Sequence, residues 1–196
     1  MKKKLVPVFI LVYLVFCNML FAQESASGKL GTLKTNDGKL IDLYDYVSKD
    51  GDSWSFHDDK GKFKVVKSKI IEWVILGPKK YLRHNIRDNN KEQRILELVA
   101  LSGKYKLFYY DGYNNFIYIF DQNDKLMEDP IKLIPGAEAG SQGNNEKAIQ
   151  TITRYFSDCN DLLQLINENL KSRNDLFHGF GLKSCPGATE IETLFK

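Results

Sequence analysis

Short runs of alternating hydrophobic and polar residues occupy the chain from about residue 29 to residue 134. Such alternation is typical of strands that bury one face. The runs are separated by turn sequences, of which Asp37 followed by Gly38 is the clearest, because glycine accepts the positive φ of a tight hairpin. The pattern therefore predicts an antiparallel β meander over residues 23–134, either a sheet or a partly closed barrel.

The centre of this meander is predicted at residues 92–120, which hold the densest run of large apolar side chains after residue 22. The segment reads as three strands joined by two turns. Residues 70–76 are apolar at both odd and even positions, which predicts a central or covered strand. Residues 125–134 contain Pro130, which cannot donate to a ladder and so favours an edge strand.

Two neighbouring segments carry expectations about single residues. In residues 62–66, Phe63 and Val65 are expected on the inner face of a strand. Residues 79–91 form the most polar segment and are expected to be an exposed loop, with a short edge strand at 80–83 as a variant. The loop's candidate anion-binding residues are Arg83, His84 and Arg87; a solvated loop without a ligand is the competing interpretation.

The hydrophobic period changes after residue 134. Residues 135–145 contain three glycines and no large side chain, which predicts a flexible linker. Beyond them the apolar residues recur with a helical period, which predicts a helical region over 146–196. The first predicted stripe holds Ala148, Ile149, Ile152, Tyr155 and Phe156, and the second Leu162, Leu163, Ile166 and Leu170. The expected fold class is α+β, one domain in which a C-terminal helix pair packs on the sheet.

Residues 1–22 have the layout of a secretory signal peptide. Three lysines precede an uncharged apolar run, and Ala22 stands at the expected cleavage position. An uncleaved anchor is an alternative, since the uncharged stretch is about as long as a minimal membrane span. Lipid attachment at Cys17 is another, although Phe16 is bulky where that processing requires a small residue.

Removal of this segment changes the charge. The whole chain has 28 basic and 25 acidic residues, and the three lysines of the segment account for the difference. The remaining 174 residues are formally neutral, so the composition gives no support for a nucleic-acid partner. We expect an exported protein that is periplasmic, associated with the outer membrane or secreted, with no integral membrane span after cleavage.

Two cysteines, Cys159 and Cys185, remain after cleavage. In an exported protein such a pair predicts a disulfide. Two free thiols or a metal pair are the alternatives, although the spacing does not match a closed zinc site.

The sequence holds no reactive motif of good specificity, and we expect no cofactor and no metal site. Asp121 and Asn123 begin like a calcium loop, but Lys125 stands where a third oxygen ligand belongs, so a hairpin turn is the preferred interpretation. The tyrosines Tyr105, Tyr109, Tyr110, Tyr113 and Tyr118 are expected to pack within the sheet rather than to form a sugar or oligonucleotide platform. An enzyme would have to use His178 with Cys185, which requires a free thiol.

Two motifs resemble those of a family of small exported proteins of unassigned function that is common in Bacteroidota. Ser102, Gly103 and Lys104 followed by the run Leu107–Tyr110 match a strand-pair motif, and Ser157, Asp158 and Cys159 match a break between helices. The resemblance implies export and the general fold and brings no catalytic residues. The expected function is a non-enzymatic binding or envelope-associated interaction module with an unidentified protein or cell-envelope partner; the alternatives are a small-ligand-binding β-barrel and a hydrolase or thiol enzyme.

Overall fold

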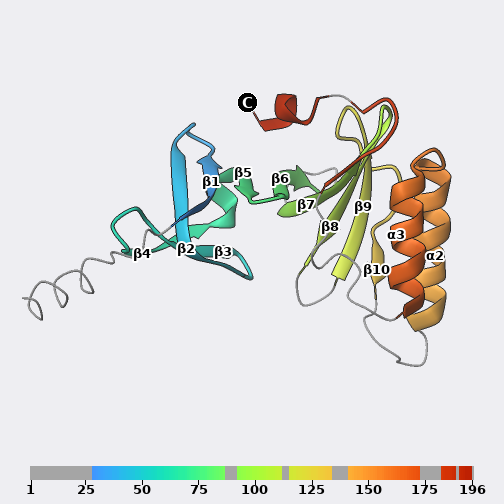
Figure 1. The fold of residues 1–196 in the computed structure, drawn as a ribbon, viewed down its shortest axis with the longest axis horizontal. Coiled ribbons are helices and arrows are strands. Elements are labelled where there is room, and N and C mark those ends of the chain that lie inside the picture. Colours follow the sequence, from blue (N-terminus) through green and yellow to red (C-terminus); the bar gives the residue numbers. More distant parts are fainter. Residues whose placement is uncertain are drawn as a thin grey trace, which may run out of the picture.

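The computed structural model describes residues 28–86, 92–111, 115–133, 141–172, 182–188 and 190–195. Within them, strands dominate the first part and helices follow, as the hydrophobic pattern predicts (Figure 1). The strands are β1 (Lys29–Thr35), β2 (Leu40–Asp50), β3 (Ser53–His57), β4 (Phe63–Lys67), β5 (Ile71–Leu76), β6 (Lys79–Asn85), β7 (Gln93–Leu101), β8 (Tyr105–Tyr110), β9 (Asn115–Asp121), β10 (Ile131–Leu133) and β11 (Lys183–Ser184). The helices are η1 (Ser68–Ile70), α2 (Ser141–Tyr155), α3 (Asn160–Ser172) and η2 (Ile191–Phe195).

These strands form one sheet in the order β10-β9-β8-β7-β6-β5-β1-β2-β3-β4, and β11 pairs with β7 off this path. All the neighbours along the path are antiparallel, and only β11 is parallel to its partner. The described strands do not close on themselves, because β10 and β4 are the two ends of the path. The fold is therefore the antiparallel sheet of the predicted α+β class, in its open form, followed by two helices.

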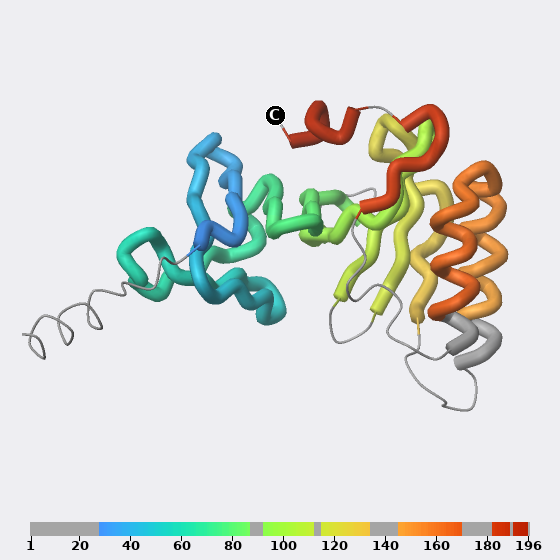
Figure 2. Tube along the Cα trace, viewed as in Figure 1, coloured from blue at the N-terminus to red at the C-terminus, as the bar shows by residue number. Residues whose placement is uncertain are grey.

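The sheet has two lobes, which we define as residues 28–78 (β1–β5) and residues 79–195 (β6–β11 with the helices). Figures 1 and 2 show the lobes side by side, with β5 and β6 between them. Gly31 lies at the centre of the first lobe, where β1 approaches β5 so closely that a Cβ on it would lie 2.1 Å from the carbonyl oxygen of Ile75. Only glycine fits at this contact between β1 and β5.

Each face of the second lobe is buried by a different element. One face of β7–β10 packs against α2 and α3, and we call it the helix face; its core includes Leu107, Ile117 and Ile152. The opposite face holds Leu96, Phe108 and Phe120, with Leu182 and Leu194 of the C-terminal segment packed against it. Burial on both faces explains why residues 95–101 are almost entirely apolar.

Several sequence-based boundaries were wrong. Residues 79–85 are the strand β6, central in the sheet rather than an exposed loop, because its backbone pairs with β5 and β7 on its two sides. The helix α2 begins at Ser141, inside the segment expected to be a linker, since a polar helical turn has no hydrophobic period to reveal it. The predicted edge strand over residues 125–134 is reduced to β10, which begins directly after Pro130.

Two smaller predictions had opposite outcomes. Phe63 and Val65 are exposed rather than on the inner face of β4, because their cross-strand partners His57 and Ser55 lie on the face opposite Trp54 and Phe56. The segment after Asp121 is a hairpin turn, as preferred over a calcium loop: the Asp121 carboxylate accepts hydrogen bonds from two backbone amides of the turn.

Candidate functional site

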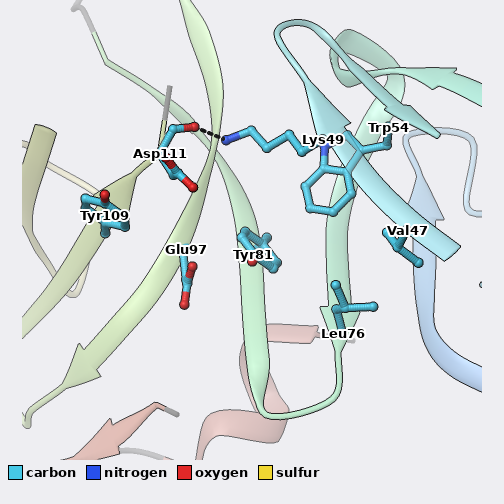
Figure 3. A pocket seen from close by; sticks show the side chains of 8 residues that line it. All are labelled: Val47, Lys49, Trp54, Leu76, Tyr81, Glu97, Tyr109 and Asp111. Atoms are coloured by element: carbon cyan, nitrogen blue, oxygen red, sulfur yellow. Dashed lines mark hydrogen bonds between the residues drawn. The ribbon is translucent and has the colours of Figure 1, made fainter. Parts of the chain in front are cut away.

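A cavity of about 140 Å³ lies between the two lobes (Figure 3). Its floor is a row of directly paired residues, Tyr81 of β6, Glu97 of β7 and Tyr109 of β8. This row continues the helix face, since Tyr109 pairs with Ile117 in the core under the helices. The complete lining is Val47, Lys49, Trp54, Leu76, Tyr81, Glu97, Tyr109 and Asp111.

The opposite wall of the cavity comes from the first lobe. Lys49 of β2 and Trp54 of β3 are directly paired and therefore lie on the same face of the sheet. In β3, residues 54 and 56 alternate with polar neighbours, which directs Trp54 inward. In β2, a register shift between Tyr44 and Val47, with a positive φ at Asp45, bends the strand before Lys49. Strand alternation and this bulge together bring a cation and an indole to the cavity.

Glu97 is a buried carboxylate in this site, with only 5% of the residue exposed. Its Oε2 lies 3.1 Å from Nζ of Lys79, and Tyr81 hydrogen-bonds to the same side chain. Burial raises the pKa of Glu97, and the charge of Lys79 acts against that rise. Burial also raises the pKa of Tyr81, so its hydroxyl remains a hydrogen-bond donor at neutral pH.

Lys49 joins the two lobes. Its Nζ donates a hydrogen bond of 3.1 Å to the backbone carbonyl oxygen of Asp111, which Figure 3 shows as a dashed line. The same atom lies 4.5 Å above the ring of Tyr110, a cation–π contact. Burial lowers the pKa of Lys49, and the charge of Asp111 acts against that fall.

Trp54 brings to the lining of the cavity a buried donor without an acceptor in the described part of the chain. The residue is 2% exposed, its ring packs edge-on against Tyr81 at 5.1 Å between centroids, and its Nε1 has no hydrogen-bond partner among the described residues. A buried N–H without an acceptor costs about 1–3 kcal/mol. A bound molecule with an oxygen acceptor beside Nε1 would remove that cost.

The cavity offers the chemistry of binding. Trp54, Lys49 and Tyr81 can donate hydrogen bonds, whereas the carboxylates of Glu97 and Asp111 can accept them. Its lining contains no serine, threonine, cysteine or histidine, and the described residues contain no group of three or more metal-ligating side chains.

Arg83 and His84, two of the three predicted anion-binding residues, do not come together. Adjacent strand residues point to opposite faces, so Arg83 and His84 diverge. Arg83 Nη1 donates to the carbonyl oxygen of Lys69 at 3.2 Å. His84 is 7% exposed, with its ring centroid 4.3 Å from that of Phe108 and 4.7 Å from that of Phe120, so it belongs to the core rather than to an anion site. Arg87 lies outside the described residues.

Cys159 and Cys185 form a disulfide, with their Cα atoms 5.0 Å apart. It ties the residue before α3 to the residue directly after β11, the strand that pairs with β7. With its sulfur in this bond, Cys185 has no thiolate for nucleophilic catalysis. His178, the other residue of the thiol-enzyme hypothesis, lies outside the described residues.

Most of the predicted tyrosine ladder packs within the fold. Tyr118 is buried and accepts a hydrogen bond from Arg94, and Tyr105 packs edge-on against Tyr155. Tyr109 lies at the cavity. Tyr113 is outside the described residues.

Sequence reasoning missed the cavity because its residues come from six strands and form no motif. One signal was present: Glu97 is the acidic residue within the otherwise apolar run 95–101. A charge in the centre of a strand buried on both faces needs partners, which makes it a candidate site residue.

Comparison of the chain with protein-family models, with curated proteins and with solved structures finds no match. The fold and the cavity are therefore the basis for a functional hypothesis. Within the described part of the chain, no helix has the length and apolar character needed to cross a membrane.

Proposed function

We propose that this protein is an exported, non-enzymatic binding module that holds one polyhydroxylated ring, such as a single sugar residue, in the cavity between its lobes. The observation that carries the proposal is the buried indole N–H of Trp54, which has no protein partner among the described residues and belongs to a side chain that lines a cavity with both donors and acceptors.

The size of the cavity limits the ligand. A dry cavity of about 150 Å³ holds benzene, so about 140 Å³ suits one six-membered ring. The site is polar, and a plain hydrocarbon would leave Trp54 Nε1 and the carboxylate of Glu97 without new partners. A sugar ring supplies oxygen acceptors to Trp54 and Lys49 and hydroxyl donors to Glu97 and Asp111. Its C–H groups can contact Val47, Leu76 and the aromatic rings.

Export is part of the proposal. The lysine-rich start and the apolar run of residues 1–22 support it, although that segment lies outside the described residues. The disulfide between Cys159 and Cys185 is compatible with an oxidising compartment. We extend the proposal to the periplasm, the outer membrane or the medium as the place of action, and to membership of the Bacteroidota family whose motifs the chain resembles.

The test uses the indole N–H signals in ¹H–¹⁵N NMR spectra of the protein from Gln23 onward. The chain has two tryptophans, so a Trp73→Phe variant assigns the Trp54 signal directly. Glucose, galactose, mannose and N-acetylglucosamine are titrated in turn. We expect at least one sugar to move the Trp54 signal in a saturable manner while the Trp73 signal of the native protein stays in place, because Trp73 does not line the cavity between the lobes.

Two variants are the controls. Trp54→Phe removes the donor and keeps an aromatic ring, and Glu97→Gln removes the charged acceptor; both should abolish binding, read from the backbone amide signals. Trp73→Phe is the matched tryptophan control and should bind normally. Failure of all four sugars to move the Trp54 signal, or unchanged binding by folded Trp54→Phe protein, would overturn the proposal.

A further inference from the structure

The strand β4 ends the sheet on the side away from the helices. Among the described residues, no strand pairs with its outer edge. Edge strands are places where another chain can add a strand, and proteins ordinarily blunt them. The outward-facing chemistry of β4 therefore decides whether this edge is blocked or available.

The hydrogen-bond phase of β4 shows which backbone groups face outward. The amide of Asp58 donates to the carbonyl of Lys62 at 3.0 Å, and the amide of Ser68 donates to that of Asp52 at 2.7 Å. Antiparallel pairs alternate between bonded and non-bonded, so Lys64 and Val66 also direct their backbone groups toward β3. The N–H and C=O groups of Phe63, Val65 and Lys67 consequently point to the free edge.

These same residues carry exposed apolar side chains. Phe63 is 55% exposed and Val65 is 53% exposed, and both lie on the face opposite the core of the first lobe. The row of rings continues across the sheet through His57 and Tyr46. The centroid of the His57 ring lies 6.0 Å from that of Phe63 and 6.3 Å from that of Tyr46. An added strand would gain both backbone hydrogen bonds and apolar contacts.

The charge around β4 indicates which kind of strand could pair with its free edge. Residues 58–69 contain five lysines and two aspartates, a formal charge of +3. The lysines are Lys60, Lys62, Lys64, Lys67 and Lys69. Two copies of β4 side by side would bring these lysines together, which opposes self-pairing. An acidic strand would complement them.

We propose that β4 is a docking edge for an extended acidic segment of another protein, with apolar residues alternating with acidic ones. The segment adds a strand antiparallel to β4, accepts and donates backbone hydrogen bonds at residues 63, 65 and 67, and places apolar side chains against Phe63 and Val65. Its carboxylates lie near the lysines at both ends of the strand. This site is distinct from the cavity, and its test does not depend on sugar binding.

The probe is a blocked heptapeptide of alternating glutamate and valine, with a lysine–valine heptapeptide as its charge control. Amide hydrogen exchange is followed residue by residue. We expect the acidic peptide to slow exchange at Phe63, Val65 and Lys67 and to leave Lys64 and Val66 unchanged, because these two amides already face β3. The lysine–valine peptide should bind about tenfold more weakly or worse. Equal protection by both peptides, or no protection by either, would overturn the proposal.

Two variants separate the proposal from other surfaces. Val65→Pro removes an outward-facing N–H, which an edge strand tolerates, and should abolish peptide binding with the fold intact. Lys62→Glu with Lys69→Glu should weaken binding, whereas Lys125→Glu, in the exposed turn before β10, should not. If the peptide fails to bind but vesicles containing anionic lipid bind the native protein and Val65→Pro equally, the edge is a membrane contact and the proposal is wrong.

Discussion

Nζ of Lys49 lies 3.1 Å from the carbonyl oxygen of Asp111, a hydrogen bond between residues 62 positions apart in the sequence. It joins β2 of the first lobe to the end of β8 in the second and passes over the cavity. Lys49→Met keeps the aliphatic stem and removes the donor. We expect the free energy of unfolding to fall by about 1 kcal/mol, the usual net value of one hydrogen bond with partial solvent access.

Chemical denaturation of Lys49→Met measures this effect, and Lys125→Met is the control, since Lys125 is exposed in a turn away from the lobe boundary. Equal stability of the two variants would mean that the bond between the lobes contributes nothing to the native state.

The buried ring of His84 predicts a loss of stability in acid. Burial lowers its pKa to about 4 from 6.5, with Asp124 acting against that fall. Between these two values the unfolded chain binds a proton that the folded protein does not, so stability falls as the pH is lowered from 6.5 to 4. This loss of folding free energy is absent above pH 6.5 and reaches about 3 kcal/mol at and below pH 4.

Denaturation series at several pH values test this, with His84→Phe as the variant that keeps an aromatic ring between Phe108 and Phe120. The variant should show a shallower fall of stability between pH 6.5 and pH 4. An identical pH profile would exclude His84 as the cause.

Gly31 should tolerate no larger residue. In Gly31→Ala the new Cβ would meet the carbonyl oxygen of Ile75 at 2.1 Å. That oxygen belongs to the backbone and the Cβ position is fixed by the backbone, so β1 and β5 would have to separate. We expect a loss of about 3 kcal/mol of stability, at the upper end of the usual cost of overpacking. Gly28→Ala is the matched control, three residues away and with no atom near the added Cβ. Thermal unfolding of the two variants decides the point, and equal midpoints would contradict the close approach.

The disulfide should stabilise the second lobe. Cys159 and Cys185 are 26 residues apart, and closing such a loop is worth about 3.5 kcal/mol in the chain-entropy model. The double variant Cys159→Ala with Cys185→Ala should lose about that amount, and added reductant should affect the native protein but not the variant. Thiol titration of the denatured native protein gives an independent check, because two reactive thiols would show that the bond is not formed.

Local sequence patterns determined the elements that depend on neighbours in the chain. The hairpin after Thr35, the strand around Trp54 and Phe56 and the burial of Ala148, Ile152 and Phe156 in and just after α2 follow from period and turn chemistry, and the structure confirms them. The pairing of Cys159 with Cys185 was also the preferred prediction, because few partners were available. The hairpin, the strand and the helical stripe need only short-range geometry, and the disulfide prediction needed only the cysteine count.

The tertiary structure decided which strands adjoin and which faces are covered. β5 turns back to pair with β1, and this places β6 inside the sheet and buries His84 in a segment whose polarity suggested a loop. The same topology exposes Phe63 and Val65 at the outer edge, although their alternation is that of an inner face. Alternation of apolar and polar residues indicates that a strand has two unlike faces. Only the long-range pairing of strands decides which face is buried.

The cavity is likewise a product of long-range strand pairing. Lys49 and Trp54 come from the β2–β3 hairpin and Glu97 from the distant strand β7, and each residue alone has an ordinary structural explanation. The sequence by itself determined a sheet and placed one carboxylate, Glu97, within the apolar run 95–101. Tertiary pairing set a cation and an unpartnered indole N–H opposite that carboxylate, because the energy of burial depends on contacts that no local pattern contains.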